Sequence, residues 1–418
     1  MVKKTLTLFI IMLAVLALIN LYLGRSLLYP PAAFSAFWSV LLLALLLSGD
    51  MFFPVSSEAL TVYYLGAFAF SAGGLIMLLA GAGLKPYPPM LEHRRKYINM
   101  MLDIGLLVLV LALPLFFYRA LAVGDTSSYA MFFYNIRMQS IANYSSQAGW
   151  SFSLLNNVVP FSILLSLAAI FSNDSSRRYH TLAVIFLTFI FQLLTGAKTG
   201  ATVLILALIG VSWIKTKRLN LKFLLMFLLS FFIFFSAITF SRSSGLVMEN
   251  KMMLFKEVQI YMLGGLVAFD RIAQDPASIP STGGVGRFFL ETAGKIGADV
   301  SVPPLHAEYT KISPANKINV YTIYFSYIQD YGLAGVVMLM FLLGSILTWV
   351  YLHAARGNPM AAITYGILFS GMILSCFGEF FITGLNFLIK AIIFSFVLYH
   401  WPLCWSRNLK RAEAGSYG

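Results

Sequence analysis

Charged residues are scarce in this chain of 418 residues: Asp, Glu, Lys and Arg make up 11% of it, whereas hydrophobic residues make up 59%. A soluble core of this length does not bury so much apolar surface, so we expect the bilayer to be the solvent of most of the chain. The apolar runs also lack strand-like alternation, which excludes a β-barrel. Because backbone amides in hydrocarbon must be paired within their own segment, the runs predict transmembrane helices.

Cysteine and the common catalytic motifs are nearly absent. The two cysteines, Cys376 and Cys404, have no metal-ligand spacing, so neither a disulfide nor a zinc site is expected. No P-loop, H-E-x-x-H, G-x-S-x-G or paired Asp-x-Asp occurs in a segment predicted to be external. Nucleotide hydrolysis, zinc proteolysis and hydrolase-type acyl transfer therefore lack motif support, and no metal or cofactor is expected. What remains is chemistry on a substrate that arrives already activated.

Eleven apolar runs between charged or Pro/Gly breaks predict an all-α polytopic membrane protein. The runs cover residues 5–23, 32–48, 59–83, 98–118, 152–172, 180–195, 200–214, 221–240, 333–352, 361–384 and 386–405. The first run resembles a signal peptide, but it is long and has no small-x-small cleavage site, so we interpret it as an uncleaved span. An odd number of spans places Lys3 and Lys4 outside, which leaves a twelfth span or a different start possible.

Basic residues cluster in short loops that fall on one side of this layout, and the positive-inside rule makes that side cytoplasmic. The clusters are Lys85 with Arg94–Lys96, Arg177 with Arg178, Lys215 with Lys217, Arg218 and Lys222, and the tail with Arg407, Lys410 and Arg411. Topology thus explains the net charge of +13 without a nucleic-acid partner. Residues 119–151 and 241–317 then lie outside, in the periplasm if the source is a Gram-negative bacterium.

Two segments depart from simple crossings. The hairpin 180–214 has arms of about 15 residues, roughly 23 Å against a hydrocarbon core of about 30 Å, so its tip at 195–200 should lie at or below the outer headgroups. Residues 319–352 would form a helix of about 51 Å, which is too long for one crossing. The sequence Asp330-Tyr331-Gly332 predicts a break there, with the first part at the outer interface.

The long external segment 241–317 is predicted to fold as a small cap over a cavity. Its eight basic and seven acidic residues nearly cancel, so it is not a polybasic lipid-binding patch. The apolar run 260–269 is too short for a span and is interpreted as a helix packed on the outer face of the membrane. The predicted organisation is therefore transmembrane helices over 1–240, the cap over 241–317 and C-terminal helices over 318–418.

Three cations are candidates for binding an anionic ligand at headgroup depth. Arg242, directly after Ser241 at the end of the span 221–240, has a planar fork that suits a diphosphate. Lys198, at the hairpin tip, should face protein or a wet cavity because intramembrane charge is costly. Arg137 lies in an aromatic external segment, where a lipid headgroup contact is favoured. Arg242 and Lys198 could alternatively snorkel to the interface.

The candidate general bases are also external. His306 is the only histidine predicted outside and titrates near neutral pH, although an ordinary loop histidine is an alternative. Glu308, Asp330 and Glu379 are carboxylate alternatives, and Glu379 lies about a turn below the outer end of its span.

Several short motifs resemble those of the Wzy-type O-antigen and oligosaccharide repeat-unit polymerases. They are Thr195-Gly196-Ala197-Lys198-Thr199-Gly200, Ser241-Arg242, Tyr261 with Gly264-Gly265, Asn319-Val320-Tyr321-Thr322 and Asp330-Tyr331-Gly332. The resemblance covers most of the chain from about residue 180, together with the general span layout before it. Lys198 stands where the family more often has arginine.

This resemblance implies a metal-independent inverting glycosyltransferase similar to the type-C membrane enzymes. Its substrates would be undecaprenyl-diphosphate-linked oligosaccharides at the outer face of a bacterial inner membrane, in lipopolysaccharide biosynthesis, with a flippase and a chain-length regulator as partners. Arg242, helped by Lys198 and Arg137, would hold the donor diphosphate, and His306 or a carboxylate would take the proton of the acceptor. Asn319 and Asp330 belong to the matched motifs. Tyr309 and Tyr321 could stack on sugar or fix the loop, but buried packing is the expected role for each.

Two other functions fit the same architecture. An O-antigen ligase shares the donor but transfers the finished chain to lipid A core, and the sequence separates it poorly from a polymerase. A flippase would be a transporter without chemistry, but such proteins usually show repeat-related halves, which this chain lacks.

Overall fold

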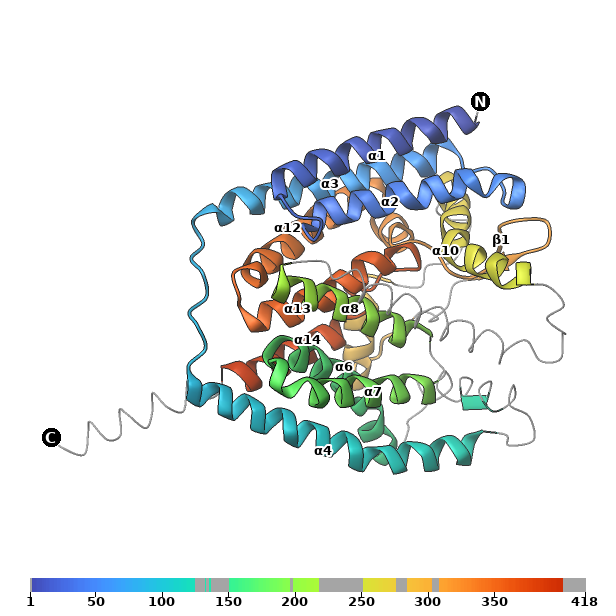
Figure 1. The fold of residues 1–418 in the computed structure, drawn as a ribbon. Coiled ribbons are helices and arrows are strands. Elements are labelled where there is room, and N and C mark those ends of the chain that lie inside the picture. Colours follow the sequence, from blue (N-terminus) through green and yellow to red (C-terminus); the bar gives the residue numbers. More distant parts are fainter. Residues whose placement is uncertain are drawn as a thin grey trace, which may run out of the picture. The chain divides into compact units, whose positions relative to one another are not determined.

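The computed structural model describes residues 2–124, 132, 135–136, 150–195, 198–217, 251–275, 284–302 and 308–400. These residues are almost entirely helical (Figure 1). The α-helices are α1 (Val2–Gly24), α2 (Pro30–Leu47), α3 (Ser57–Ala80), α4 (Glu92–Val123), α6 (Trp150–Ser172), α7 (Arg178–Leu194), α8 (Lys198–Thr216), α10 (Lys251–Gln274), α11 (Arg287–Lys295), α12 (Tyr324–Ala355), α13 (Pro359–Ile373) and α14 (Leu385–Tyr399). Short 3-10 turns, among them η1 (Gly49–Met51) and η5 (Leu374–Cys376), and a two-stranded hairpin of β1 (Thr310–Lys311) and β2 (Lys317–Ile318) complete the described structure.

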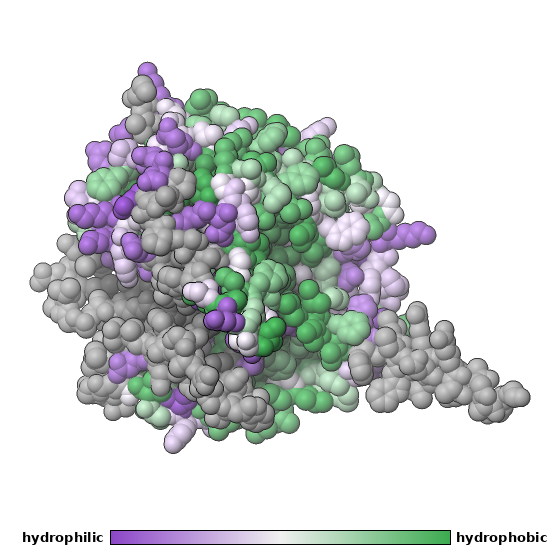
Figure 2. Space-filling view, turned by 180° about the vertical axis from the view of Figure 1, so that it is seen from behind, coloured by the Kyte–Doolittle hydropathy of each residue, from purple (hydrophilic) through white to green (hydrophobic). Residues whose placement is uncertain are grey.

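Seven of the helices are long and apolar enough to cross a membrane, as expected for a multi-pass membrane protein. They cover Lys3–Gly24, Pro30–Leu47, Ser57–Gly83, Glu92–Val123, Thr199–Thr216, Tyr324–Ala355 and Pro359–Cys376, and shorter apolar helices cover Asn157–Ser172 and Leu385–Tyr399. Many large apolar side chains point outward, such as Leu18 and Leu111, both 64% exposed. Figure 2 shows hydrophobic side chains over much of the visible face, which suits contact with lipid rather than water.

Helices occupy ten of the eleven predicted spans, and seven of these ten are long and apolar enough to cross a membrane. The eleventh predicted span, 221–240, lies outside the described residues. The arms of the predicted hairpin are α7, with 17 residues, and α8, with 19 residues, so they are longer than predicted and α8 is long enough to cross. The predicted break in the long C-terminal helix is confirmed, because Gly332 within α12 has φ 65° and ψ −164°. This backbone conformation favours glycine, since a Cβ would clash with the neighbouring peptide.

The predicted span 361–384 was too long. Helix α13 and the following turn η5 end at Cys376, and the chain then turns before α14 begins at Leu385. The reason is that the carboxylate of Glu379 accepts hydrogen bonds from the backbone N–H groups of Phe381, Ile382 and Thr383. These N–H groups are therefore not available to pair with the carbonyl groups four residues earlier, as a continued helix would require.

The chain forms two compact units that interleave along the sequence. The first comprises Met1–Lys85, Glu249–His353 and Gly371–Leu388, and the second comprises Pro86–Met248, Ala354–Ser370 and Ile389–Gly418. The second unit is built on α4, α6, α7 and α8 and is joined by polar contacts, including an ion pair of Asp103 with Arg177 and a contact of Asp103 with the His180 ring, 3.1 Å away. A hydroxyl pair of Ser166 and Thr188, 2.9 Å apart, links α6 to α7.

Buried aromatic rings form the core of the first unit. Trp38 of α2, Tyr63 of α3 and Tyr324 of α12 lie with ring centroids 5.0 to 5.6 Å apart, and Phe269 of α10 packs 5.4 Å from Tyr63. The Tyr63 hydroxyl donates to the carbonyl of Leu266, 2.7 Å away. These contacts fix α10 against the transmembrane helices, and residues 260–269 are thus largely buried within this unit.

Candidate functional site

The C-terminal half of α10 supplies one wall of the candidate site. The carboxylate of Asp270 accepts hydrogen bonds from the backbone N–H of Ser56, at 2.7 Å, and from the side chain of Gln274, at 2.8 Å. Asp270 therefore holds the end of α10 against the N-cap of α3. The next residue, Arg271, is exposed.

The β1–β2 hairpin supplies the opposite wall. Its register pairs Thr310 with Ile318 and Lys311 with Lys317, and a turn closes it where the Ser313 hydroxyl accepts from the N–H of Asn316. Because neighbouring strand residues point to opposite faces, Ile318 is buried whereas both lysines are exposed. The two lysines are thus cross-strand neighbours.

Glycines allow this hairpin to lie against α10. A Cβ on Gly264 would lie 3.0 Å from atoms of both Ile312 and Ile318, and one on Gly265 would lie 2.6 Å from the carbonyl oxygen of Cys376. The backbone N–H of Phe53 donates to the carbonyl of Ile312 at 2.9 Å, which ties the hairpin to the segment before α3. The Gly264-Gly265 motif therefore has a packing role.

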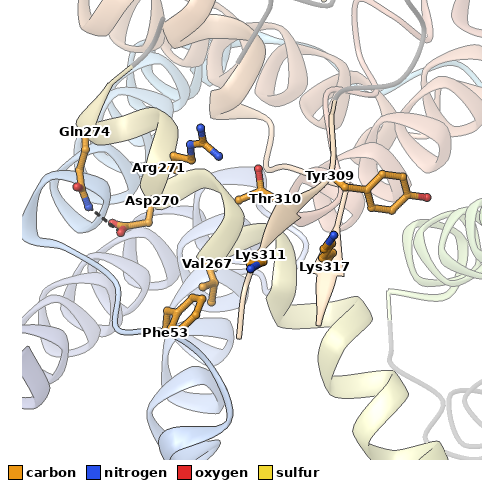
Figure 3. Close-up of a pocket in the computed structure, with 9 residues that line it drawn as sticks. All are labelled: Phe53, Val267, Asp270, Arg271, Gln274, Tyr309, Thr310, Lys311 and Lys317. Carbon is orange, nitrogen blue, oxygen red and sulfur yellow. Dashed lines mark hydrogen bonds between the residues drawn. The ribbon is translucent and has the colours of Figure 1, made fainter. Parts of the chain in front are cut away.

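The two walls enclose a cavity of about 480 Å³ (Figure 3). Nine residues line it: Phe53, Val267, Asp270, Arg271, Gln274, Tyr309, Thr310, Lys311 and Lys317. Three are cations and one is an acid, and that acid is already hydrogen-bonded within the protein. Among the described residues, no carboxylate forms an ion pair with Arg271, Lys311 or Lys317. The cavity can therefore attract an anion.

The pairing of Lys311 with Lys317 gives the excess of positive charge a cost in stability. Like charges directly opposite one another destabilise a β-pair, by up to about 1 kcal/mol on the scale of cross-strand energies. With only two residues in each strand, the hairpin has few other cross-strand pairs to offset this cost, and its packing against α10 holds it in place. An anionic ligand bridging the two ammonium groups would turn the repulsion into binding energy.

Tyr321 supports the hairpin through hydrogen bonds to the start of β1 and to the segment before it. Its hydroxyl lies 2.6 Å from the Thr310 hydroxyl and donates to the Glu308 carbonyl at 2.9 Å, and its ring stacks on Phe325 with centroids 4.4 Å apart. Burial raises the pKa of Tyr321, while the neighbouring Thr310 hydroxyl and Arg271 act in the opposite direction. The phenol therefore remains neutral near pH 7, which favours a structural role.

The other predicted residues around the hairpin differ in exposure. Tyr309 is 68% exposed at the cavity rim, so the expected buried packing holds for Tyr321 and not for Tyr309. Glu308, beside it in sequence, is exposed, and Asn319 is half-buried directly after β2. Asp330 lies two residues before the break in α12 and accepts a hydrogen bond from the backbone N–H of Val285 at 3.1 Å. All four belong to the first unit.

Glu379 is 7% exposed and its carboxylate is fully engaged. Beside the three backbone N–H groups, the Tyr327 hydroxyl donates to it at 3.2 Å. These four donors occupy both carboxylate oxygens and leave them little room to accept a hydrogen bond from a substrate hydroxyl. Its surroundings favour holding the α13–α14 turn over acting as a general base.

The remaining predicted residues cannot be placed at this cavity. Arg137, Arg242 and His306 lie outside the described residues. Lys198 begins α8 in the second unit, and its side chain is not among those described.

Sequence reasoning counted Arg271, Lys311 and Lys317 only as contributors to a neutral loop. A local signal was present: Thr310-Lys311-Ile312 and Lys317-Ile318 flank Ser313-Pro314-Ala315-Asn316, and such turn residues between short alternating segments are typical of a hairpin. That pattern pairs the lysines. Only the fold brings Arg271 to them.

No group of three or more His, Cys, Asp or Glu side chains in the described part of the chain could hold a metal ion. In comparisons with known proteins, no family model, curated protein or solved structure matches this chain.

Proposed function

We propose that this protein is an O-antigen-type polymerase, a membrane glycosyltransferase that joins lipid-diphosphate-linked oligosaccharide units without a metal ion. The observation that carries the proposal is the cavity at which three cations without a carboxylate partner in the described structure converge. A diphosphate is the anion expected at a membrane enzyme whose substrates arrive already activated. The family resemblance of the sequence motifs supports the same substrate class.

The position of the cavity supports a reaction on the outer side of the membrane. The cavity adjoins the start of α3, through Phe53 and Ser56, whereas the basic residue Lys85 follows the other end of that helix. If Lys85 faces the cytoplasm, as the positive-inside rule predicts, the cavity faces outward. In a bacterium this is the outer face of the inner membrane.

The proposed reaction is a single displacement. The acceptor hydroxyl attacks the anomeric carbon of the donor sugar, the new C–O bond forms, and the bond from that carbon to the diphosphate oxygen breaks. The base takes the hydroxyl proton, and the lipid diphosphate leaves with the electron pair. Cations near that diphosphate stabilise its developing charge.

Residue roles follow from the sequence and from the site together. Arg271, Lys311 and Lys317 bind the diphosphate at the cavity. From the sequence, Arg242, assisted by Lys198 and Arg137, is the candidate for holding the donor diphosphate, and His306 is the first candidate for the base, with Glu308 as the alternative. Tyr309, which is exposed at the rim, is the candidate for stacking on a sugar. Asn319, Tyr321 and Asp330 position the loop, as Glu379 positions its turn.

The test is complementation of a deletion strain by charge-neutral variants. Lys311→Gln combined with Lys317→Gln should shorten or abolish the polysaccharide ladder, because the cavity loses two of its three cations. Lys295→Gln, on the exposed part of α11, is the matched control and should leave the ladder unchanged. Arg242→Ala and His306→Ala test the residues inferred from sequence. Full-length ladders in all these variants, at equal membrane levels, would refute the assigned site.

The deletion strain also separates the rival functions. Loss of a polymerase leaves lipid A core carrying one repeat unit, whereas loss of a ligase leaves the core bare. Accumulation of lipid-linked units on the cytoplasmic face would instead indicate a flippase and would overturn the enzyme proposal.

A further inference from the structure

Helix α11 exposes its apolar face and turns an ion pair toward the protein. At 100° per residue, Phe289, Ala293 and Ile296 share one face and Arg287 and Glu291 share the opposite one, while the exposed Thr292 and Lys295 lie on the flank between them. The apolar face is the exposed one, since Phe289 is 60% and Ile296 is 82% exposed. The ion pair of Arg287 with Glu291 is turned inward, with side chains only 14% and 25% exposed.

This orientation is fixed by the surrounding chain. Just before α11, a Cβ on Gly284 would meet the Ser326 side chain at 2.2 Å, and the N–H of Val285 donates to Asp330. These contacts dock the start of α11 on the first turns of α12. At the other end, Gly297 has φ 94°, and the N–H of Ala298 returns to the carbonyl of Ala293, which closes the helix with a left-handed cap.

The exposed apolar face continues a surface that already faces lipid. Tyr331 and Leu333, at the break in α12 beside Asp330, are 52% and 46% exposed, and Val337 and Met338 follow on the same helix. α12 is one of the helices long and apolar enough to cross the membrane. Phe289 therefore lies near the point where the lipid-facing surface of α12 begins.

We propose that α11 is a membrane-interface helix, with Phe289 and Ile296 inserted at the boundary between headgroups and acyl chains. An amphipathic helix of this kind buries its apolar side chains in lipid and leaves its basic residues, here Lys295, at headgroup level. It anchors the external loop and holds the cationic hairpin at the depth of lipid phosphates. The inference is independent of the reaction proposed above.

Spin labelling of the full chain in phospholipid nanodiscs tests this inference. Labels are placed at Phe289→Cys and Ile296→Cys on the apolar face, with Lys295→Cys on the polar flank as the matched exposed control. Cys404 is replaced by serine, and the buried Cys376 is retained. Collision with apolar O₂ and with a water-soluble nickel chelate is then compared at each label.

The expected result is a reversal between the apolar face and the polar flank. O₂ should be the stronger relaxant at positions 289 and 296, and the nickel chelate should be the stronger at position 295. Dominance of the chelate at 289 and 296 would show a water-exposed face and overturn the inference. Low accessibility to both reagents there would show that protein covers the face, which would also overturn it.

Discussion

At the scale of single residues, the site is defined by charges that the protein leaves uncompensated. The carboxylate of Asp270 accepts hydrogen bonds from Ser56 and Gln274, and among the described residues it forms no ion pair with Lys311 or Lys317. Lys311 and Lys317 face each other across a hairpin that would be more stable without the pair. If the cavity binds an anion, as proposed, the ligand offsets this repulsion.

Lys317→Glu should therefore raise stability and lower function together. The substitution places a carboxylate opposite Lys311 and converts a repulsive cross-strand pair into an attractive one, for a gain of up to about 1 kcal/mol. The polysaccharide ladder should nevertheless be lost, because the cavity loses a cation and gains an anion. Thermal unfolding in detergent and complementation measure the two effects. A fall in both would mean that Lys317 is needed for folding alone.

Glu379→Gln tests whether this carboxylate is structural. The amide offers its N–H₂ to backbone N–H groups, so at least one buried donor loses its acceptor at a cost of about 1–3 kcal/mol. Tyr327→Phe removes one donor only and should cost about 1 kcal/mol or less. Thermal unfolding of the purified variants distinguishes the two, and unchanged stability of the glutamine variant with lost activity would restore Glu379 as a catalytic candidate.

At the scale of elements, the first unit depends on a close crossing of α3 and α12. A Cβ on Gly344 would lie 1.9 Å from the carbonyl oxygen of Phe70, and one on Gly73 would lie 2.0 Å from that of Phe341. Small residues let helices approach where water provides no drive for association. The crossing keeps the start of α12 in place, and with it Tyr321, which contacts the hairpin that forms one wall of the cavity.

Gly344→Ala should destabilise this crossing by about 1–3 kcal/mol, since the two backbones must separate to admit the methyl group. Gly83→Ala is the control, because nothing lies within 4 Å of a Cβ at that position. Its effect should stay within about 0.5 kcal/mol. The comparison is made by thermal unfolding in one detergent, and equal midpoints would refute the close crossing.

At the scale of the whole molecule, the apolar surface and the distribution of basic residues define an orientation. Lys85 and Lys295 are both exposed, and the proposed topology places them on opposite sides of the membrane. In intact cells with a permeable outer barrier, an impermeant maleimide should label Lys295→Cys and not Lys85→Cys. Both should react after lysis. Labelling of position 85 alone would invert the topology and remove the proposed outer site.

The sequence alone predicted the apolar helices and the break at Gly332. These features depend on composition and on local backbone preference, so they are readable from consecutive residues. Helix length near residue 379 was misjudged because apolar side chains continue past the turn. The helix does not continue because the carboxylate of Glu379 accepts hydrogen bonds from the backbone N–H groups of Phe381 and Thr383, which follow it in the chain.

Only the tertiary structure decided where the positive charge of the long loop acts. Lys311 lies 40 positions after Arg271 in the sequence, and the near-neutral total of the loop does not show that three of its cations gather at one cavity beside a single acid. The outward apolar face of α11 is likewise a matter of orientation, since the pattern of residues in a helix is the same whichever face is turned to the protein. The charge balance of a segment and the amphipathic pattern of a helix can be read from the sequence. Which side chains come into contact depends on how distant segments pack together.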